Sequence, residues 1–114
     1  MVKKHAEMKR EIRSQVRGGV GDLEMVHLLE EAELSGKAKM CAKFTIAPGC
    51  SIGEHAHDPD GELYIILSGA GMVNDNGTPR EVSAGDAVWT ADGERHSIIN
   101  HGTKPLELYA IVIN

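Results

Sequence analysis

Two histidines separated by one residue, His55 and His57, are followed five residues later by a glutamate, Glu62. Side chains at alternate positions of an extended chain point to the same face, so both imidazoles face one way if this segment is a strand. The residues between His57 and Glu62, DPDG, are typical of a turn and would return the chain so that Glu62 meets the histidines. Imidazole nitrogens and carboxylate oxygens are common ligands of first-row divalent metals. The spacing therefore predicts a metal site.

His96 is the best candidate for a fourth ligand. It follows a turn at residues 91–94 and opens a short apolar strand that ends before Asn100. A carboxylate at the head of an apolar strand, as at Glu62, is costly to bury without a partner, which favours a ligand role. Two plainer interpretations stay open: that these are structural polar residues in turns, or that a bound metal only stabilises the fold.

The elements that must position these side chains read as short strands. Between residues 37 and 46, Met40, Ala42, Phe44 and Ile46 share one face, an alternation typical of a half-buried strand. The dipeptide Asn76-Gly77 predicts a hairpin turn. Strands are predicted at residues 23–29, 37–46, 62–67, 72–73, 80–82, 87–90, 95–99 and 106–113. Thirteen glycines and no long amphipathic pattern indicate an all-β sandwich or barrel.

Charge is distributed unevenly along the chain. Residues 1–17 carry six basic and two acidic side chains, whereas the rest carries six basic and fifteen acidic ones. Glycines at residues 18–21 interrupt whatever precedes them. We predict a basic N-terminal arm over 1–21, solvated and at most weakly helical, and a β-barrel domain over 22–114. The arm has no interleaved aromatic residues and the body is acidic, so we expect no nucleic-acid partner.

Composition excludes several other classes. No apolar run approaches the roughly 20 residues of a membrane span, so no membrane partner is expected. The basic N-terminus lacks the apolar stretch of a secretory signal, and we expect a cytoplasmic location. Cys41 and Cys50, the two cysteines, are then expected to be free thiols.

Taken together, these positions resemble the two motifs of the cupins. The first motif is matched at every fixed position, by Gly49, His55, His57, Glu62 and Gly69. The second is matched by Gly85, Gly93, His96 and Asn100, with Ala91 where the family usually has proline. That departure affects one turn and no ligand.

The resemblance implies a double-stranded β-helix, the jelly-roll barrel of cupins, with one divalent metal held inside by His55, His57, Glu62 and His96. The ion is Mn, Fe, Ni, Co or Zn, and its open positions would receive a small-molecule substrate or ligand. The chain is similar to small bacterial cupins labelled as resembling oxalate decarboxylase or mannose-6-phosphate isomerase. Among enzymes, a metal-dependent dioxygenase needs the fewest further residues and is placed ahead of a decarboxylase or an isomerase. The alternative is a non-catalytic, metal-dependent binding module.

A few other residues enter the hypothesis. Tyr64 is in phase with Glu62, and Glu94 lies in the turn before His96, so both are weak catalytic candidates. Arg95 should face away from the metal, and Trp89 is expected in the core. The outer apolar residues of the strand at 62–67 need cover, which predicts a homodimer with the region before residue 34 contributing to its interface.

Overall fold

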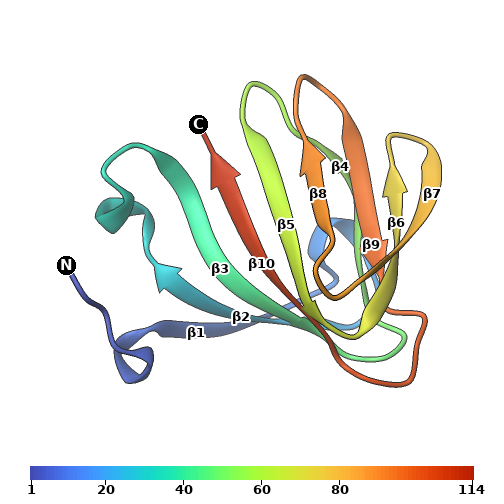
Figure 1. The fold of residues 1–114 in the computed structure, drawn as a ribbon, viewed down its shortest axis with the longest axis horizontal. Coiled ribbons are helices and arrows are strands. Elements are labelled where there is room, and N and C mark those ends of the chain that lie inside the picture. The colour runs from blue at the N-terminus through green and yellow to red at the C-terminus, as the bar shows by residue number, and fades with distance from the viewer.

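The computed structural model describes all 114 residues, which form ten strands and three single-turn 3-10 helices (Figure 1). The strands are β1 (Lys9–Ser14), β2 (Asp22–Leu29), β3 (Ala38–Ile46), β4 (Ser51–Ala56), β5 (Gly61–Ser68), β6 (Ala70–Asp75), β7 (Thr78–Ser83), β8 (Ala87–Thr90), β9 (Arg95–Ile99) and β10 (Leu106–Ile113). The helices are η1 (His5–Glu7), η2 (Val16–Gly18) and η3 (Glu31–Leu34). None of these helices is long or apolar enough to cross a membrane.

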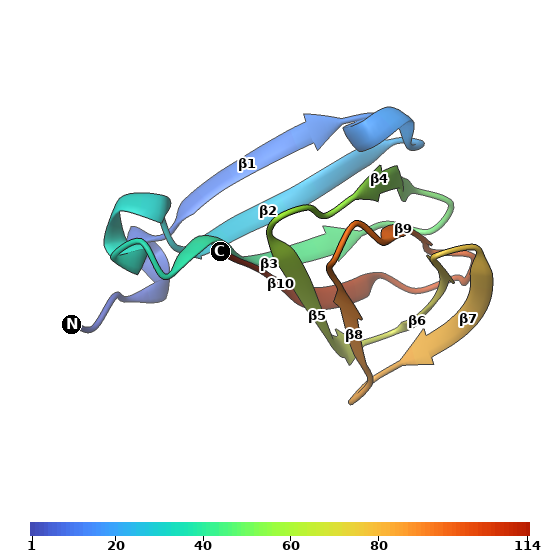
Figure 2. The same ribbon diagram turned by 90° about the horizontal axis from the view of Figure 1, so that it is seen from above.

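The strands form two antiparallel sheets that face each other. The larger sheet has the order β1-β2-β3-β10-β5-β8, and the smaller has the order β4-β9-β6-β7. Chain neighbours such as β3 and β4 or β5 and β6 lie in different sheets, so the chain repeatedly crosses between layers (Figures 1 and 2). The predicted all-β jelly-roll barrel is confirmed.

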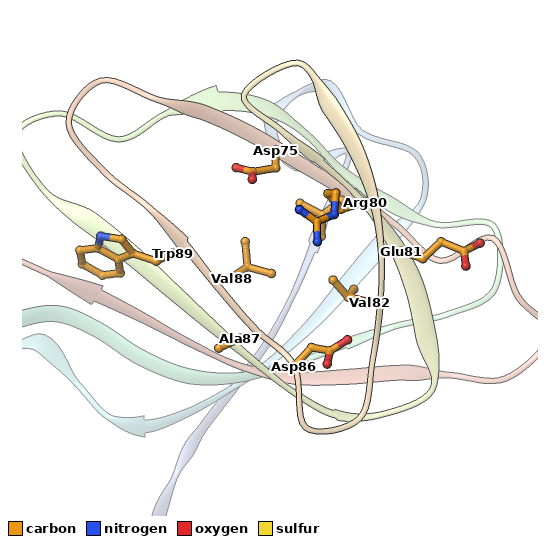
Figure 3. A pocket seen from close by; sticks show the side chains of 9 residues that line it. Asp75, Arg80, Glu81, Val82, Asp86, Ala87, Val88 and Trp89 are labelled. Atoms are coloured by element: carbon orange, nitrogen blue, oxygen red, sulfur yellow. The ribbon is translucent and has the colours of Figure 1, made fainter.

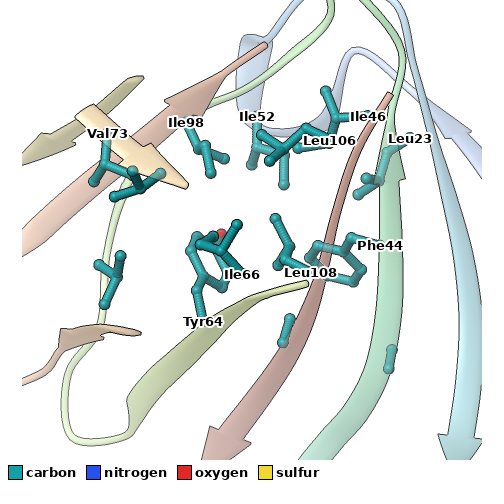
Figure 4. Close-up of a cluster of buried hydrophobic side chains, with 14 of the residues drawn as sticks. Leu23, Phe44, Ile46, Ile52, Tyr64, Ile66, Val73, Ile98, Leu106 and Leu108 are labelled. Carbon is teal, nitrogen blue, oxygen red and sulfur yellow. The ribbon is translucent and has the colours of Figure 1, made fainter. Parts of the chain in front are cut away.

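Apolar side chains from both sheets meet in one core (Figure 4). On β3 the predicted inward face is confirmed, because Ala42, Phe44 and Ile46 are buried and the half-buried Met40 packs against the same core. Each fully buried Leu, Ile or Phe side chain contributes about 1.5–3 kcal/mol relative to exposure. The hairpin between β6 and β7 turns at Asn76 and Gly77, both with positive φ, as its sequence predicts.

Strand β5 differs from its predicted environment. Its run of apolar residues suggested cover on both faces, and Tyr64 and Ile66 on the inner face are indeed buried. On the outer face, Leu63, Ile65 and Leu67 are only half-buried. The homodimer that would cover this face stays a prediction.

The N-terminal segment is not weakly helical, and this expectation is wrong for residues 9–14. They form β1, which pairs along its full length with β2 at the margin of the larger sheet (Figure 2). Backbone hydrogen bonds to β2 satisfy a strand that carries almost no apolar side chains. The division into an arm over 1–21 and a barrel over 22–114 stays a prediction.

Candidate metal centre

Three strands and one strand end bring His55, His57, Glu62 and His96 together. His55 lies on β4 directly opposite His96 on β9, and His57 follows the end of β4. Glu62 opens β5 in the opposing sheet. One ligand atom from each residue lies within 4.8 Å of all the others, and all four side chains are buried. The sequence-predicted set therefore converges in space.

The carboxylate of Glu62 lies at the centre of the group. Its Oε1 atom is 3.0 Å from Nε2 of His57, 3.0 Å from Nε2 of His96 and 3.7 Å from Nε2 of His55. The Nε2 atoms of His55 and His96 are 3.1 Å apart. All three imidazoles thus present the same nitrogen to one point.

The outward nitrogen of each imidazole has a partner of its own. Nδ1 of His55 donates to the Gly53 carbonyl at 2.9 Å, and Nδ1 of His57 donates to the Asp60 carboxylate at 3.0 Å. Nδ1 of His96 is hydrogen-bonded to the Thr90 hydroxyl at 2.9 Å. In the tautomer that donates from Nδ1 to these partners, the Nε2 lone pair is free to bind a metal ion, as in metal-binding histidines.

This arrangement fits a divalent cation. Three neutral imidazoles with inward lone pairs, 3.1 Å apart at the closest, repel one another unless a positive charge lies between them. Three nitrogens and one oxygen suit the first-row transition metals and leave positions open on a six-coordinate ion. The residues present could therefore hold the metal that the motif implies.

The electrostatics of the metal-free group point the same way. Burial raises the pKa of Glu62, but hydrogen bonds from the three histidines outweigh it and hold that pKa well below its usual value. The hydrogen bond to Glu62 raises the pKa of His57 despite partial burial. In the absence of metal, the Glu62 carboxylate therefore favours the protonated form of His57.

A small pocket opens onto the group. Its volume is about 140 Å³, and its wall is mostly apolar. Tyr64 lines it and stacks on His96, with ring centroids 4.9 Å apart and planes inclined by 15°. Burial and the nearby Glu62 carboxylate raise the pKa of Tyr64 well above its usual value, so its hydroxyl stays protonated. The inward orientation predicted for Tyr64 is confirmed.

Two residues near the ligands point elsewhere. Glu94 is exposed in the turn between β8 and β9 and does not line the pocket. Arg95 is exposed, as predicted, and its Nε lies 3.4 Å from a carboxylate oxygen of Glu54. Neither side chain reaches the space in front of the four candidate ligands.

Trp89 is not in the core, and that expectation is wrong. It is 52% exposed and borders a hollow of about 320 Å³ beside β6, β7 and β8 (Figure 3). Trp89 lies on β8 at the margin of the larger sheet, directly opposite Leu63, so its side chain shares the outer face with that residue. This hollow contains none of the four candidate ligands.

Sequence reasoning missed two cationic residues of the pocket. Arg13 from β1 and Arg17 from η2 line the same space as His55, His57 and Glu62. Both belong to the segment expected to be a solvated arm. Their basic character was visible in the sequence, but no spacing linked them to the histidine motif, because the pairing of β1 with β2 is what carries them there.

Comparisons with known proteins agree with this geometry. The family model described as "Cupin domain" (Cupin_2) matches residues 42–112. The chain is 42% identical over 113 residues to an oxalate-binding protein of Thermotoga maritima, covering 99% of this chain and 93% of that protein.

Solved structures show the same fold. A crystal structure from Thermotoga maritima, described as a predicted oxalate decarboxylase, superposes with a TM-score of 0.93 at 42% identity, covering 99% of this chain and 98% of the other. A polyketide cyclase of Streptomyces resistomycificus shares only the fold, with a TM-score of 0.81, 19% identity and coverage of 99% and 80% of the two chains. With its motifs, its barrel and these relatives in agreement, the chain belongs to the cupin family.

Proposed function

We propose that this protein holds one divalent transition-metal ion through His55, His57, Glu62 and His96 and uses it to bind a small carboxylate anion. The observation that carries the proposal is a buried set of three Nε2 atoms and one carboxylate opening onto a small pocket. The ion, one of Mn, Fe, Ni, Co or Zn, would act as a Lewis acid and fix the ligand's orientation.

The size of the pocket favours a ligand of few atoms. Its volume of about 140 Å³ is below the 300–1,000 Å³ typical of sites for drug-sized ligands. Oxygen atoms of a carboxylate suit the open positions of such an ion. The 42% identity to an oxalate-binding protein supports oxalate as the first ligand to test.

Binding without turnover is favoured over catalysis by the residues that face the pocket. Of the two catalytic candidates, only Tyr64 lines the pocket, and its raised pKa makes it a poor base. Glu94 is exposed outside the pocket. Of the functions that the sequence leaves open, the metal-dependent binding module therefore has the stronger support.

Metal content and oxalate binding test the proposal together. Elemental analysis of the purified protein should find about one transition-metal ion per chain, and His57→Ala should lose most of it. Isothermal titration with oxalate should give heat with the metal-loaded protein and none after chelation. Retention of metal by His57→Ala, or equal oxalate binding by the metal-free protein, would contradict the proposal.

A metal-dependent dioxygenase is the second candidate, supported by the mostly apolar wall around the pocket, which suits a small apolar substrate beside the ion. Its test is oxygen uptake by the iron-loaded protein with small diols, diketones and thiols. Uptake that depends on one of these compounds and disappears in His57→Ala would assign an enzymatic role. Silence across the panel, with iron confirmed in the protein, leaves the binding function.

A further inference from the structure

The N-terminal segment closes one side of the metal pocket. Arg13 and Arg17 line the same space of about 140 Å³ as His55, His57 and Glu62. Both arginines therefore border the space in which a ligand of the ion would lie, although they are far from the cupin motifs in the sequence.

Tight backbone packing holds η2 against β4. A Cβ atom at Gly53 would collide with the backbone carbonyl of Arg17, and one at Gly19 would collide with the carbonyl of Ser51. Ser51 also exchanges two hydrogen bonds with Val20, through its backbone N–H at 2.8 Å and its hydroxyl at 2.9 Å. Because the carbonyl of Gly53 orients the ring of a candidate ligand, one glycine joins the N-terminal segment to the metal centre.

The two arginines differ in how free they are to bind a ligand. Arg13 lies opposite Leu23, which is buried, so its side chain starts from the inner face of the larger sheet. Its Nε is held at 2.6 Å by Glu11, a carboxylate that His27 also contacts at 2.6 Å. No carboxylate lies within salt-bridge distance of Arg17.

The backbone at Arg17 is also unusual. Its φ of 55° lies in the left-handed region, as does the φ of 50° at Gln15. Non-glycine residues in that region cost on the order of 1 kcal/mol or more and persist where surrounding structure requires them. The carbonyl of Arg17 packs against Gly53 within this turn, and Arg17 lines the pocket with no carboxylate paired to its guanidinium.

We propose that Arg17, assisted by Arg13, binds the outer oxygens of the carboxylate ligand and makes the site selective for dicarboxylate dianions over monocarboxylates. The inference rests on the proposed function. A dicarboxylate that chelates the ion through one oxygen of each carboxylate leaves two oxygens facing outward, which match the planar fork of a guanidinium.

The charges around the pocket agree with a dianion. A bound divalent ion and the guanidinium groups of Arg13 and Arg17 would be set against the carboxylates of Glu11, Glu62 and Asp60, and Lys39 also pairs with Asp60 at 3.1 Å. The positive excess would be neutralised by a dianion and only partly by a monoanion. Arg17 is thus a specificity-determining residue of the proposed site.

The test uses the manganese-loaded full-length protein and isothermal titration with oxalate and with acetate. Arg17→Gln should weaken oxalate binding about tenfold or more while changing acetate binding little, because it removes a charge-assisted hydrogen-bonding fork. The oxalate affinity of Arg17→Lys, which keeps the charge but loses the planar fork, should lie between those of the unaltered protein and Arg17→Gln. Manganese content should equal that of the unaltered protein.

Arg10→Gln is the matched control. Arg10 lies on the same strand as Arg13 but on the opposite face, across from Val26. Its replacement by glutamine changes the net charge by the same amount as Arg17→Gln. The inference is overturned if Arg17→Gln binds oxalate like the unaltered protein, or if Arg10→Gln weakens binding equally. If the unaltered, manganese-loaded protein binds no oxalate, the proposed function itself fails, and the inference fails with it.

Discussion

Replacing Glu62 by glutamine separates a metal site from a merely structural polar cluster. Glutamine keeps the shape of the side chain but removes the negative charge that three Nε2 atoms surround at 3.0–3.7 Å. In the metal-free protein the change removes charge-assisted hydrogen bonds, each contributing about 1.5–3 kcal/mol. It also removes the cost of burying a carboxylate, which offsets much of that loss. The metal-free variant should therefore unfold within a few degrees of the metal-free parent.

The metal-loaded protein should respond differently. Metal at about a hundred times its Kd stabilises a protein by about 2.7 kcal/mol. For 114 residues, an unfolding entropy of about 2.1 cal/mol/K per residue converts this into a rise in Tm of about 11 °C. Loss of the carboxylate ligand should weaken metal binding about a hundredfold or more, so the same metal concentration should raise the Tm of Glu62→Gln by only about 2 °C.

Thermal unfolding followed by circular dichroism, with and without metal, measures both differences. Glu81→Gln is the matched control, because the side chain of Glu81 is 78% exposed on β7, and its metal-induced rise in Tm should equal that of the parent. The reasoning is refuted if Glu62→Gln retains the full metal-induced rise. It is refuted equally if metal leaves the Tm of the parent unchanged.

Four further outcomes are expected. Thr90→Val should weaken metal binding about ten- to a hundredfold in a competition titration with a chromophoric chelator, because it removes the partner that orients one imidazole. Phe44→Ala should lower the free energy of unfolding in urea by about 3–5 kcal/mol, because a buried ring is lost. In chelator, the stabilising contribution of His57 is lost as pH rises through its raised pKa, and that of Glu62 is lost as pH falls below 4.5 toward its lowered pKa. The pair should therefore stabilise the protein most between pH 4.5 and 6.5, measured as Tm against pH. A Tm that continues to fall below pH 4.5 would support this contribution of Glu62. Light scattering should give the mass of two chains, since the outer apolar face of β5 is half-buried in one chain, and a monomer mass would contradict this.

Most of the barrel could be predicted because most of its strands bury one face in the core. Alternation along β3 identified the buried positions Ala42, Phe44 and Ile46, and the Asn76-Gly77 turn placed β6 and β7 as a hairpin. These signals are local, since a strand with one buried face needs period-two patterning and a tight hairpin needs positive φ.

The candidate ligands were predictable for a different reason. His55 and His96 come from segments 41 residues apart, and periodicity alone does not bring them together. Their position in two motifs of the cupin type predicted the pairing, and in the structure β4 pairs with β9 so that His55 lies opposite His96. The supporting contacts from Gly53, Asp60 and Thr90 followed only from the structure.

Strand β1 was missed because it has no hydrophobic pattern to find. Its one apolar residue, Ile12, is exposed on the outer face, and the inner face carries Lys9, Glu11 and Arg13. A strand of this kind is held by backbone hydrogen bonds to β2 and by ion pairs, neither of which leaves a periodic signal in the sequence. Charge alone suggested a solvated arm.

The two halves of the proposed site therefore arise from different parts of the chain. The candidate metal ligands lie within residues 42–112, which match the cupin family, whereas Arg13 and Arg17 lie before that region. A barrel that contributes only the side chains that hold a metal ion can bind many small molecules, because the open positions of the ion accept any small oxygen donor. The wall that β1 and η2 add decides which of these donors also meets a guanidinium. Ligand choice in this protein should accordingly change with substitutions in the N-terminal segment that leave metal binding intact.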